Sequence, residues 1–360
     1  MVSYDFLGPE KILKAYDPKT GMKAVIVLDN TARGPAKGGI RMTPTVDEEE
    51  VFGLARAMTL KNALANLPFG GGKSGIIANP KELTIEEKEG IVRAYGKAIK
   101  QLAPEIYVAA PDISMGEREM RWIADEAGPK SITGKPVDLG GIPHELGSTG
   151  YGVYISVREL LKLQDDSLEG KTVTVQGYGN VGSFAADFME RDGAKLIAAS
   201  DSSCTLYDPD GIDAHKLREF KESGKRLSEY PEHEKLEPMD VLFIECDILV
   251  PAAQKHVITA DNQDRVSAKI ISQGANLPIE HHVERLLEKR GVQNIPDILA
   301  NAGGVISSYI EHIGGSADDI FPEIEKIIAG NIKELGDALI NTESDARKAC
   351  IELAHKRLEQ

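Results

Sequence analysis

The sequence predicts an α/β fold with two domains: an N-terminal mixed α/β domain and a doubly wound domain of the Rossmann type. Three observations predict it. The chain has 360 residues, enough for two domains of ordinary size. From about residue 148, strand-like and helix-like segments alternate regularly, which is typical of a parallel sheet covered by helices. A glycine-rich string, G-x-G-x-x-G, joins one of these strands to the next helix.

The N-terminal half has a mixed pattern. Asp47 and three glutamates fall where the first turn of a helix favours acidic side chains. Thr84 and Glu87 have the spacing of a capping box, which marks the start of a second helix. The elements expected here are strands at Met22–Leu28 and Ile106–Ala109, and helices at Asp47–Ala65, Thr84–Gln101 and Glu117–Ala127.

The C-terminal half is predicted to contain helices at Thr149–Leu163 and Val181–Arg191 and strands at Thr172–Gln176, Lys195–Ser200, Ile248–Val250 and Lys269–Ser272. Residues from Ala302 onward have a helical pattern. We place the domain boundary near Gly140-Gly141. The predicted domains are therefore 1–140, joined by C-terminal helices at about 320–360, and 141–319.

Composition excludes several function classes. The net charge of −15 is a poor match for nucleic acid or an anionic membrane surface, so neither is expected as a partner. The opening residues lack a signal-peptide pattern, and no apolar run approaches a membrane span. The three cysteines are far apart and have neither metal-ligand spacing nor a disulfide framework. We expect a cytoplasmic protein without a metal.

The most regular motif is Gly177-Tyr178-Gly179-Asn180-Val181-Gly182, between an apolar strand and a helix. Such glycines allow a pyrophosphate to meet a helix N-terminus. Asp201 ends the next strand, where a carboxylate binds ribose hydroxyls. A carboxylate at this position repels the 2′-phosphate of NADP, so Asp201 favours NAD. Ser202 and Ser203 could bind a 2′-phosphate, so NADP remains an alternative coenzyme.

Lysines in the first half point to a second site. Lys61 lies on the same side of its helix as the apolar stripe, and a lysine that faces inward needs an anion. Lys73 follows Gly70-Gly71-Gly72. This segment is not a phosphate-binding P-loop, because Leu67 stands where that motif requires glycine. A lysine kept from water beside other cations loses proton affinity and can act as a base.

Two further residues complete this group. Lys37 precedes Gly38-Gly39, and Asp112 follows the strand expected at Ile106–Ala109. Functional sites of α/β proteins often lie at the ends of strands, and this is where the carboxylate of Asp112 is expected. Taken alone, Asp112 would be read as a turn residue.

In combination, these motifs resemble the glutamate/leucine/phenylalanine/valine dehydrogenase family over nearly the whole chain. The matching segments are Gly34–Met42, Met58–Lys61, Leu67–Gly75, Ala110–Asp112, Ser148–Gly152, Gly177–Gly182, Cys246–Ala253, Gly274–Asn276 and Asn301–Val305. The resemblance implies reversible oxidative deamination of an amino acid, a substrate-binding and oligomerising N-terminal domain, and a homo-oligomer, hexameric or octameric.

The resemblance also implies roles. Lys61 would hold the substrate α-carboxylate, Lys73 would activate water, and Asp112 would move protons to and from the substrate nitrogen. Thr149, Asn276 and Asn301 would orient the nicotinamide end of the coenzyme. Ala252, in the matched Cys246–Ala253 segment, is also expected to line the coenzyme site.

The same resemblance favours L-glutamate as substrate. In the glutamate-specific branch, the distal carboxylate meets a lysine and a serine at the positions of Lys37 and Ser308. Gly38, Ala110 and Val305 would complete that pocket. The alternative is a leucine or valine dehydrogenase, which would carry apolar residues at both polar positions. Glu145 departs from many glutamate enzymes, which have arginine there. A more remote alternative is a non-catalytic nucleotide-sensing protein.

Overall fold

The structure, a computed structural model, describes residues 2–143 and 146–360. Glu145 therefore lies outside the described residues. The chain forms two compact units. The first unit contains the described residues up to Pro143 with Val305–Ile320 and Ala354–Gln360, and the second contains residues 146–304 and 321–353.

This division differs from the predicted domains at the C-terminal end. The predicted N-terminal domain took all of 320–360, whereas most of these residues belong to the second unit. The reason is their contacts. Arg158 donates to Glu325 at 2.6 Å and the Tyr151 and Phe321 ring centroids are 4.4 Å apart, so residues 321–353 pack within the second unit.

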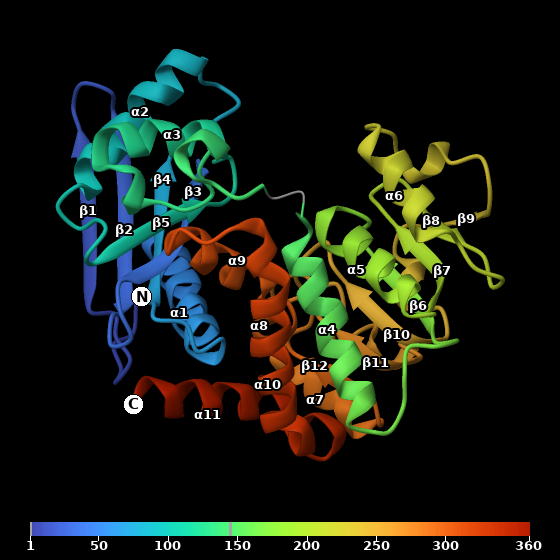
Figure 1. Cartoon of the computed structure of the whole chain (residues 1–360). Helices are drawn as coiled ribbons and strands as arrows, with labels where there is room; N and C mark the ends of the chain where they lie inside the picture. Colours follow the sequence, from blue (N-terminus) through green and yellow to red (C-terminus); the bar gives the residue numbers. More distant parts are fainter. Residues whose placement is uncertain (1, 144–145) are drawn as a thin grey trace. The chain divides into compact units, whose positions relative to one another are not determined.

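The first unit is built on a five-stranded sheet of order β1-β2-β4-β3-β5 (Figure 1). Its strands are β1 (Lys11–Asp17), β2 (Met22–Asn30), β3 (Ala36–Thr43), β4 (Gly70–Ile77) and β5 (Tyr107–Pro111). β3 pairs in parallel with both β4 and β5, and β2 pairs antiparallel with β1 and β4.

Helices cover the two faces of this sheet. The helices are α1 (Glu48–Leu64), α2 (Ile85–Ile99) and α3 (Glu117–Ala127). Both predicted N-terminal caps are present: Asp47 accepts from the amide of Glu50, and Thr84 forms a capping box with Glu87. One face packs Ile40 and Ile76 against α2 and α3 in the main core, while Val51 of α1 packs on the other face.

The second unit contains a seven-stranded sheet of order β12-β11-β10-β6-β7-β8-β9. Its strands are β6 (Thr172–Gln176), β7 (Lys195–Ser200), β8 (Thr205–Tyr207), β9 (Glu234–Leu236), β10 (Cys246–Pro251), β11 (Ala268–Ser272) and β12 (Gln293–Ile295). The five strands from β12 to β7 are parallel, and β8 and β9 add antiparallel pairs. Since β7 and β10 lie on opposite sides of β6, the strand order reverses beside β6.

The remaining helices are α4 (Ser148–Lys162), α5 (Asn180–Arg191), α6 (Ala214–Glu222), α7 (His281–Lys289), α8 (Asp297–Ala300), α9 (Gly303–His312), α10 (Ile320–Ile340) and α11 (Ala346–Leu358). Within residues 2–143 and 146–360, none of the helices combines the length and apolarity that crossing a membrane requires.

One strand was not predicted from the sequence. No secondary structure was assigned to Leu67–Gly75, and Gly70–Ile77 is strand β4 in the middle of the sheet. Glycine has low strand propensity, so the run gives no strand signal. Here it is selected by close packing: a Cβ at Gly71 would lie 2.1 Å from Thr59 Oγ1 on α1.

Candidate functional site

The first group of predicted residues lies on the face of the five-stranded sheet that α1 covers. Strand pairing places Lys37 opposite Gly71 and Arg41 opposite Gly75. Because side chains alternate between faces along a strand, Lys37, Arg41 and Lys73 project from the same face. The sheet therefore brings three cations together from two neighbouring strands.

Lys73 and Asp112 form the closest contact in this group. Lys73 Nζ lies 2.8 Å from Asp112 Oδ2, and Arg41 Nε donates to the same oxygen at 3.1 Å. Lys73 is 8% exposed. Burial lowers the pKa of Lys73, with Arg41 adding to the effect while Asp112 opposes it. Burial alone would raise the pKa of Asp112, but Lys73 and Arg41 outweigh it and lower the pKa.

Gly39 leaves the space in which this pair meets. A Cβ at Gly39 would lie 2.9 Å from Asp112 Cβ and 3.1 Å from Lys73 Nζ. Any larger residue would push the two functional groups apart. Gly38 is equally restricted, since a Cβ there would lie 1.6 Å from the Gly72 carbonyl oxygen.

Lys37 is buried in a polar surrounding at one end of the same sheet. Its Nζ donates to Thr133 Oγ1 at 2.5 Å, and only 3% of the residue is exposed. Burial lowers its pKa to about 7; Glu311 opposes this shift, and Lys73 and Lys135 add to it. Lys37 is thus an ammonium group that burial, aided by neighbouring cations, makes easier to deprotonate.

Helix α9 places Ser308 and Val305 within the first unit. Ser308 is three residues before Glu311 and four before His312, so the three share one helix face. Both Glu311 and His312 interact electrostatically with Lys37. The predicted pocket residue Ser308 therefore lies on the side of α9 that faces Lys37. Ala110, on β5, is paired with Gly39.

Lys61 lies in the last turn of α1 and is 9% exposed. The prediction that it faces inward is confirmed by this burial. Its neighbour Asn62 is fully buried and donates to the Gly70 carbonyl at 2.7 Å, which fixes the end of α1 on β4.

The glycine motif of the second unit has three distinct local structures. Gly177 has φ +92°, which a tight turn requires, and a Cβ at Gly182 would lie 2.1 Å from the Gly177 carbonyl oxygen. Gly179, in contrast, has no other atom within 4 Å of a Cβ position. These are the three demands of a dinucleotide turn: a sharp bend, close helix–strand packing, and open space where a pyrophosphate approaches the backbone.

The residues around this turn converge from several elements. Asn180 is the first residue of α5 and is exposed. A Cβ at Gly274 would lie 3.0 Å from Ala252 Cβ and 3.1 Å from Val181 Cγ1, so Ala252 and Val181 meet the 274–276 loop. The predicted residues Val181 and Ala252 are thus neighbours in space.

Asn276 and Asn301 are in direct contact. Asn301 Nδ2 donates to Asn276 Oδ1 at 3.1 Å and to the Ala275 carbonyl at 3.2 Å. Thr149, near the start of α4, lies beside Gly304, since a Cβ there would be 2.9 Å from Thr149 Oγ1. The side chains expected at the nicotinamide end are therefore grouped around the start of α9.

Asp201 differs from the free carboxylate that the motif suggests. Its Oδ1 accepts from the amide and Oγ of Ser203 at 2.8 and 2.5 Å, and its Oδ2 accepts from Lys221 Nζ at 2.6 Å and the Leu227 amide at 2.9 Å. Burial opposes the charge, but Lys221 and Ser203 hold the pKa of Asp201 well below its usual range. Ser202, beside it, is exposed.

Sequence reasoning missed several residues of both groups. Arg41 stands in a quoted motif but received no role, and nothing in the pattern links Lys37 to Thr133 or Glu311, which are far away in the sequence. Lys221 carries no motif either. Among residues 2–143 and 146–360, no three histidine, cysteine or acidic side chains are grouped as a metal site requires.

Two family models match the chain. The model of the glutamate/leucine/phenylalanine/valine dehydrogenase matches residues 140–360, and the model of the dimerisation domain of Glu/Leu/Phe/Val dehydrogenases matches residues 9–128.

Curated relatives and solved structures agree with these models. A glutamate dehydrogenase of Aeropyrum pernix is 46% identical over 79% of this chain and 70% of its own length. An NADP-specific glutamate dehydrogenase of Saccharolobus shibatae is 40% identical over 91% of this chain and 82% of its own. The crystal structure of hetero-hexameric glutamate dehydrogenase from Thermus thermophilus, in a leucine-bound form, superposes with a TM-score of 0.86 at 30% identity, covering 98% of this chain and 88% of that one.

Proposed function

Because the chain belongs to the glutamate/leucine/phenylalanine/valine dehydrogenase family, we propose that it catalyses the reversible oxidative deamination of L-glutamate to 2-oxoglutarate and ammonium. The observation that carries this proposal is the buried contact between Lys73 and Asp112. Both residues of the pair are suited to moving protons at a reacting carbon–nitrogen centre.

Each residue of the pair has a distinct task. Lys73, with its lowered pKa, takes a proton from the water that attacks the imine carbon of the oxidised substrate. Asp112 exchanges protons with the substrate nitrogen, so that ammonia leaves as ammonium. Lys61 holds the α-carboxylate by a charge-assisted contact. The nearby cations also stabilise negative charge that develops on oxygen as water adds.

Lys37 favours glutamate over an aliphatic amino acid. A buried ammonium group beside Thr133, with Ser308 on the facing side of α9, suits the distal carboxylate of glutamate. A leucine side chain would leave these polar groups without a partner. Sites built around such groups typically reject the apolar analogue by about 10⁴-fold.

The residues of the second unit fit a nicotinamide dinucleotide. The open space at Gly179 and the exposed N-terminus of α5 suit its pyrophosphate, and Asn276 and Asn301 suit its amide-bearing ring. A nicotinamide dinucleotide bound by these residues would supply the hydride acceptor for oxidation of the substrate. We propose that both NAD and NADP are used, since Lys221 offsets the charge by which Asp201 would repel a 2′-phosphate.

We also propose that the protein is a homo-oligomer. Residues 9–128 match a dimerisation-domain model, and apolar side chains of the five-stranded sheet are exposed in the same unit. Tyr16 on β1 is 63% exposed and Ile77 on β4 is 38% exposed. They line a surface hollow of about 550 Å³ together with Val25 and Val46.

A substrate panel tests the proposal. The purified protein is given glutamate, leucine, valine or phenylalanine with NAD or NADP, and formation of reduced nicotinamide is followed by absorbance. We expect activity with glutamate to exceed that with leucine by at least about 10³-fold. The double variant Lys37→Leu with Ser308→Val should lose most of the glutamate activity and gain activity with leucine.

Two results would overturn parts of this proposal. A wild-type enzyme that prefers leucine or valine would contradict the role given to Lys37 and Ser308 and favour the aliphatic alternative. Absence of reduction with every amino acid and both coenzymes, in protein that still binds the coenzyme, would instead favour a nucleotide-sensing protein.

A further inference from the structure

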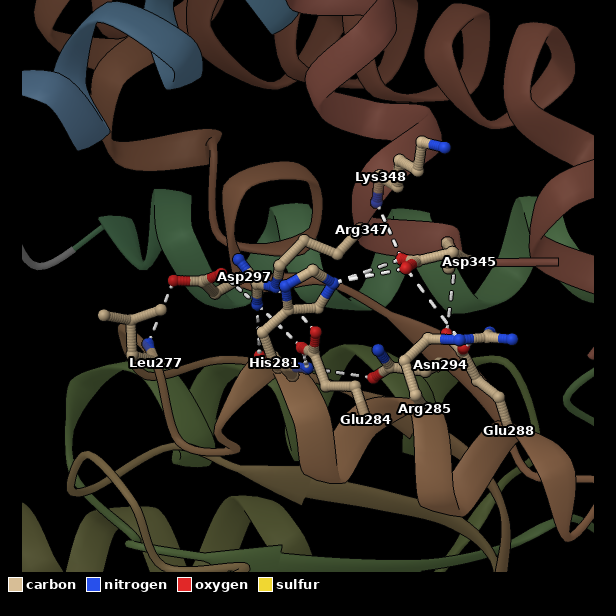
Figure 2. Close-up of polar contacts among 12 residues, drawn as sticks. Leu277, His281, Glu284, Arg285, Glu288, Asn294, Asp297, Asp345, Arg347 and Lys348 are labelled. Atoms are coloured by element: carbon tan, nitrogen blue, oxygen red, sulfur yellow. Dashed lines mark hydrogen bonds and ion pairs between the residues drawn. The ribbon is translucent and has the colours of Figure 1, made fainter.

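A buried network of charges, outside the residues considered so far, contacts Leu277, the residue that follows Asn276 (Figure 2). Arg347 of α11 donates to Glu284 of α7 from Nε at 2.6 Å and from Nη2 at 2.7 Å. Nη2 also donates to Asp297 Oδ1 at 2.8 Å. All three side chains are less than 10% exposed.

The network continues directly to the loop. The other carboxylate oxygen of Asp297, Oδ2, accepts from the Leu277 amide at 3.0 Å. Leu277 is the residue after Asn276 and has φ +48°, a left-handed conformation that a leucine adopts only when its surroundings hold it. Asp297 therefore fixes the backbone at the point where the loop leaves Asn276.

Asp297 and Glu284 both accept from Arg347. The network joins one arginine and two carboxylates in a buried region, where Arg347 also donates to Gln273. Removal of the guanidinium would take the contact with Arg347 from both carboxylates, which favours their separation, protonation or hydration. Each of these responses weakens the hydrogen bond that Asp297 accepts from the Leu277 amide.

We propose that Arg347 is a positioning residue for coenzyme binding, which acts through Asp297 and Leu277 to hold Asn276 where the nicotinamide ring binds. This inference rests on the proposed function, because it takes Asn276 as a contact of the nicotinamide end. It makes helix α11, which carries Arg347, part of the structure that fixes the coenzyme geometry.

Arg285 offers a matched control in the same region. It lies next to Glu284 on α7, contacts Glu288, and donates to the carbonyls of Glu343 and Ser344 before α11. Figure 2 shows its side chain directed toward Glu288 and Asp345, away from the Asp297 end of the network. Arg285 thus tethers the start of α11 without touching Asp297 or Leu277.

The experiment compares Arg347→Lys, Arg347→Met and Arg285→Met with the wild-type protein. Arg347→Lys keeps a positive charge in the network but cannot bind both carboxylates in the same geometry, so it is the variant that should fold if Arg347→Met does not. Two ligands are titrated by protein fluorescence and calorimetry: the reduced nicotinamide dinucleotide, and ADP-ribose, which lacks the nicotinamide ring.

In Arg347→Lys we expect the reduced coenzyme to bind about tenfold more weakly, the loss of one good hydrogen bond, while ADP-ribose binds within about twofold of the wild type. Arg285→Met should bind both ligands as the wild type does, even if its melting temperature falls. A general destabilisation of the fold would weaken the binding of both ligands equally.

Equal losses for the two ligands in Arg347→Lys, or unchanged binding of both, would overturn the inference. So would a tenfold selective loss in Arg285→Met, since that variant leaves Asp297 in place. A wild-type protein that binds the coenzyme but reduces it with no amino acid would contradict the proposed function instead. The two failures are therefore distinguishable.

Discussion

Lys73 of β4 and Asp112, one residue beyond β5, meet across β3 with 2.8 Å between Nζ and Oδ2. The contact passes over Gly39, whose missing side chain leaves it room. Burial lowers the pKa of Lys73, and Lys73 and Arg41 together keep Asp112 ionised. The sheet thus supplies, side by side, a lysine that can be neutral and a carboxylate that is charged before it takes up a proton.

Arg41→Met should move the pH dependence of activity to higher pH. Arg41 is a cation that lowers the pKa of Lys73, so its removal raises that pKa. Because neutral Lys73 is the base, the rise of kcat with pH then begins later. At neutral pH we expect a loss on the order of tenfold, as for one charge-assisted contact. The control is Arg93→Met, in the same unit on α2, and an unmoved profile in Arg41→Met would refute the effect.

Binding of glutamate should weaken as pH rises through about 7, the pKa of Lys37. The distal carboxylate binds the protonated lysine, which is the form lost on raising the pH. Glu311 raises this pKa, so Glu311→Gln should lower it further and shift the increase in KM to lower pH. Steady-state KM for glutamate measured across pH 6–9 checks this. A KM independent of pH in both proteins would contradict it; exposed Glu105→Gln is the control.

Lys221→Ala should discriminate between the coenzymes. Without the ammonium 2.6 Å from its Oδ2, Asp201 carries an unscreened charge that repels a 2′-phosphate. We expect KM for NADP to rise about tenfold and KM for NAD to change little. Lys225→Ala, in which the lost ammonium lies over the Phe220 ring instead, is the matched control. Equal changes for both coenzymes would show that Lys221 has no part in the selection.

Gly179→Val and Gly182→Ala should fail in different ways. The space around Gly179 is open, so the valine variant should fold with a normal melting temperature but bind coenzyme at least about tenfold more weakly. At Gly182 a Cβ would lie 2.7 Å from Val175 Cγ1, and overpacking of this kind costs about 1–3 kcal/mol of stability. Thermal unfolding and coenzyme titration of the two variants check the distinction.

The sequence predicts some parts of this protein better than others. The glycine motif and the capped helices carry local signals, and their positions agree with the structure. Strand β4 was hidden because its triple glycine has no strand propensity, although tight packing against α1 selects it.

The candidate site, too, has features that the sequence predicts and features that it does not. Burial of Lys61 follows from helical periodicity, whereas the contact of Lys37 with Thr133 joins residues 96 positions apart and has no local signal. Asp201 lies at the strand end that the motif predicts, but its saturation by Lys221 and Ser203 depends on a later helix and loop. Tertiary contacts of this kind cannot be predicted from the spacing of residues in the sequence.

The most direct test of the central claim measures hydride transfer from glutamate and release of 2-oxoglutarate in single turnovers of the wild-type protein, Lys73→Met and Asp112→Asn, alongside coenzyme affinity. We predict that both variants bind coenzyme within about twofold of wild type. Release of 2-oxoglutarate should be at least about 10²-fold slower in both variants, the usual contribution of a general acid or base. Turnover within threefold of wild type in either variant would contradict the assignment of that residue to the chemistry.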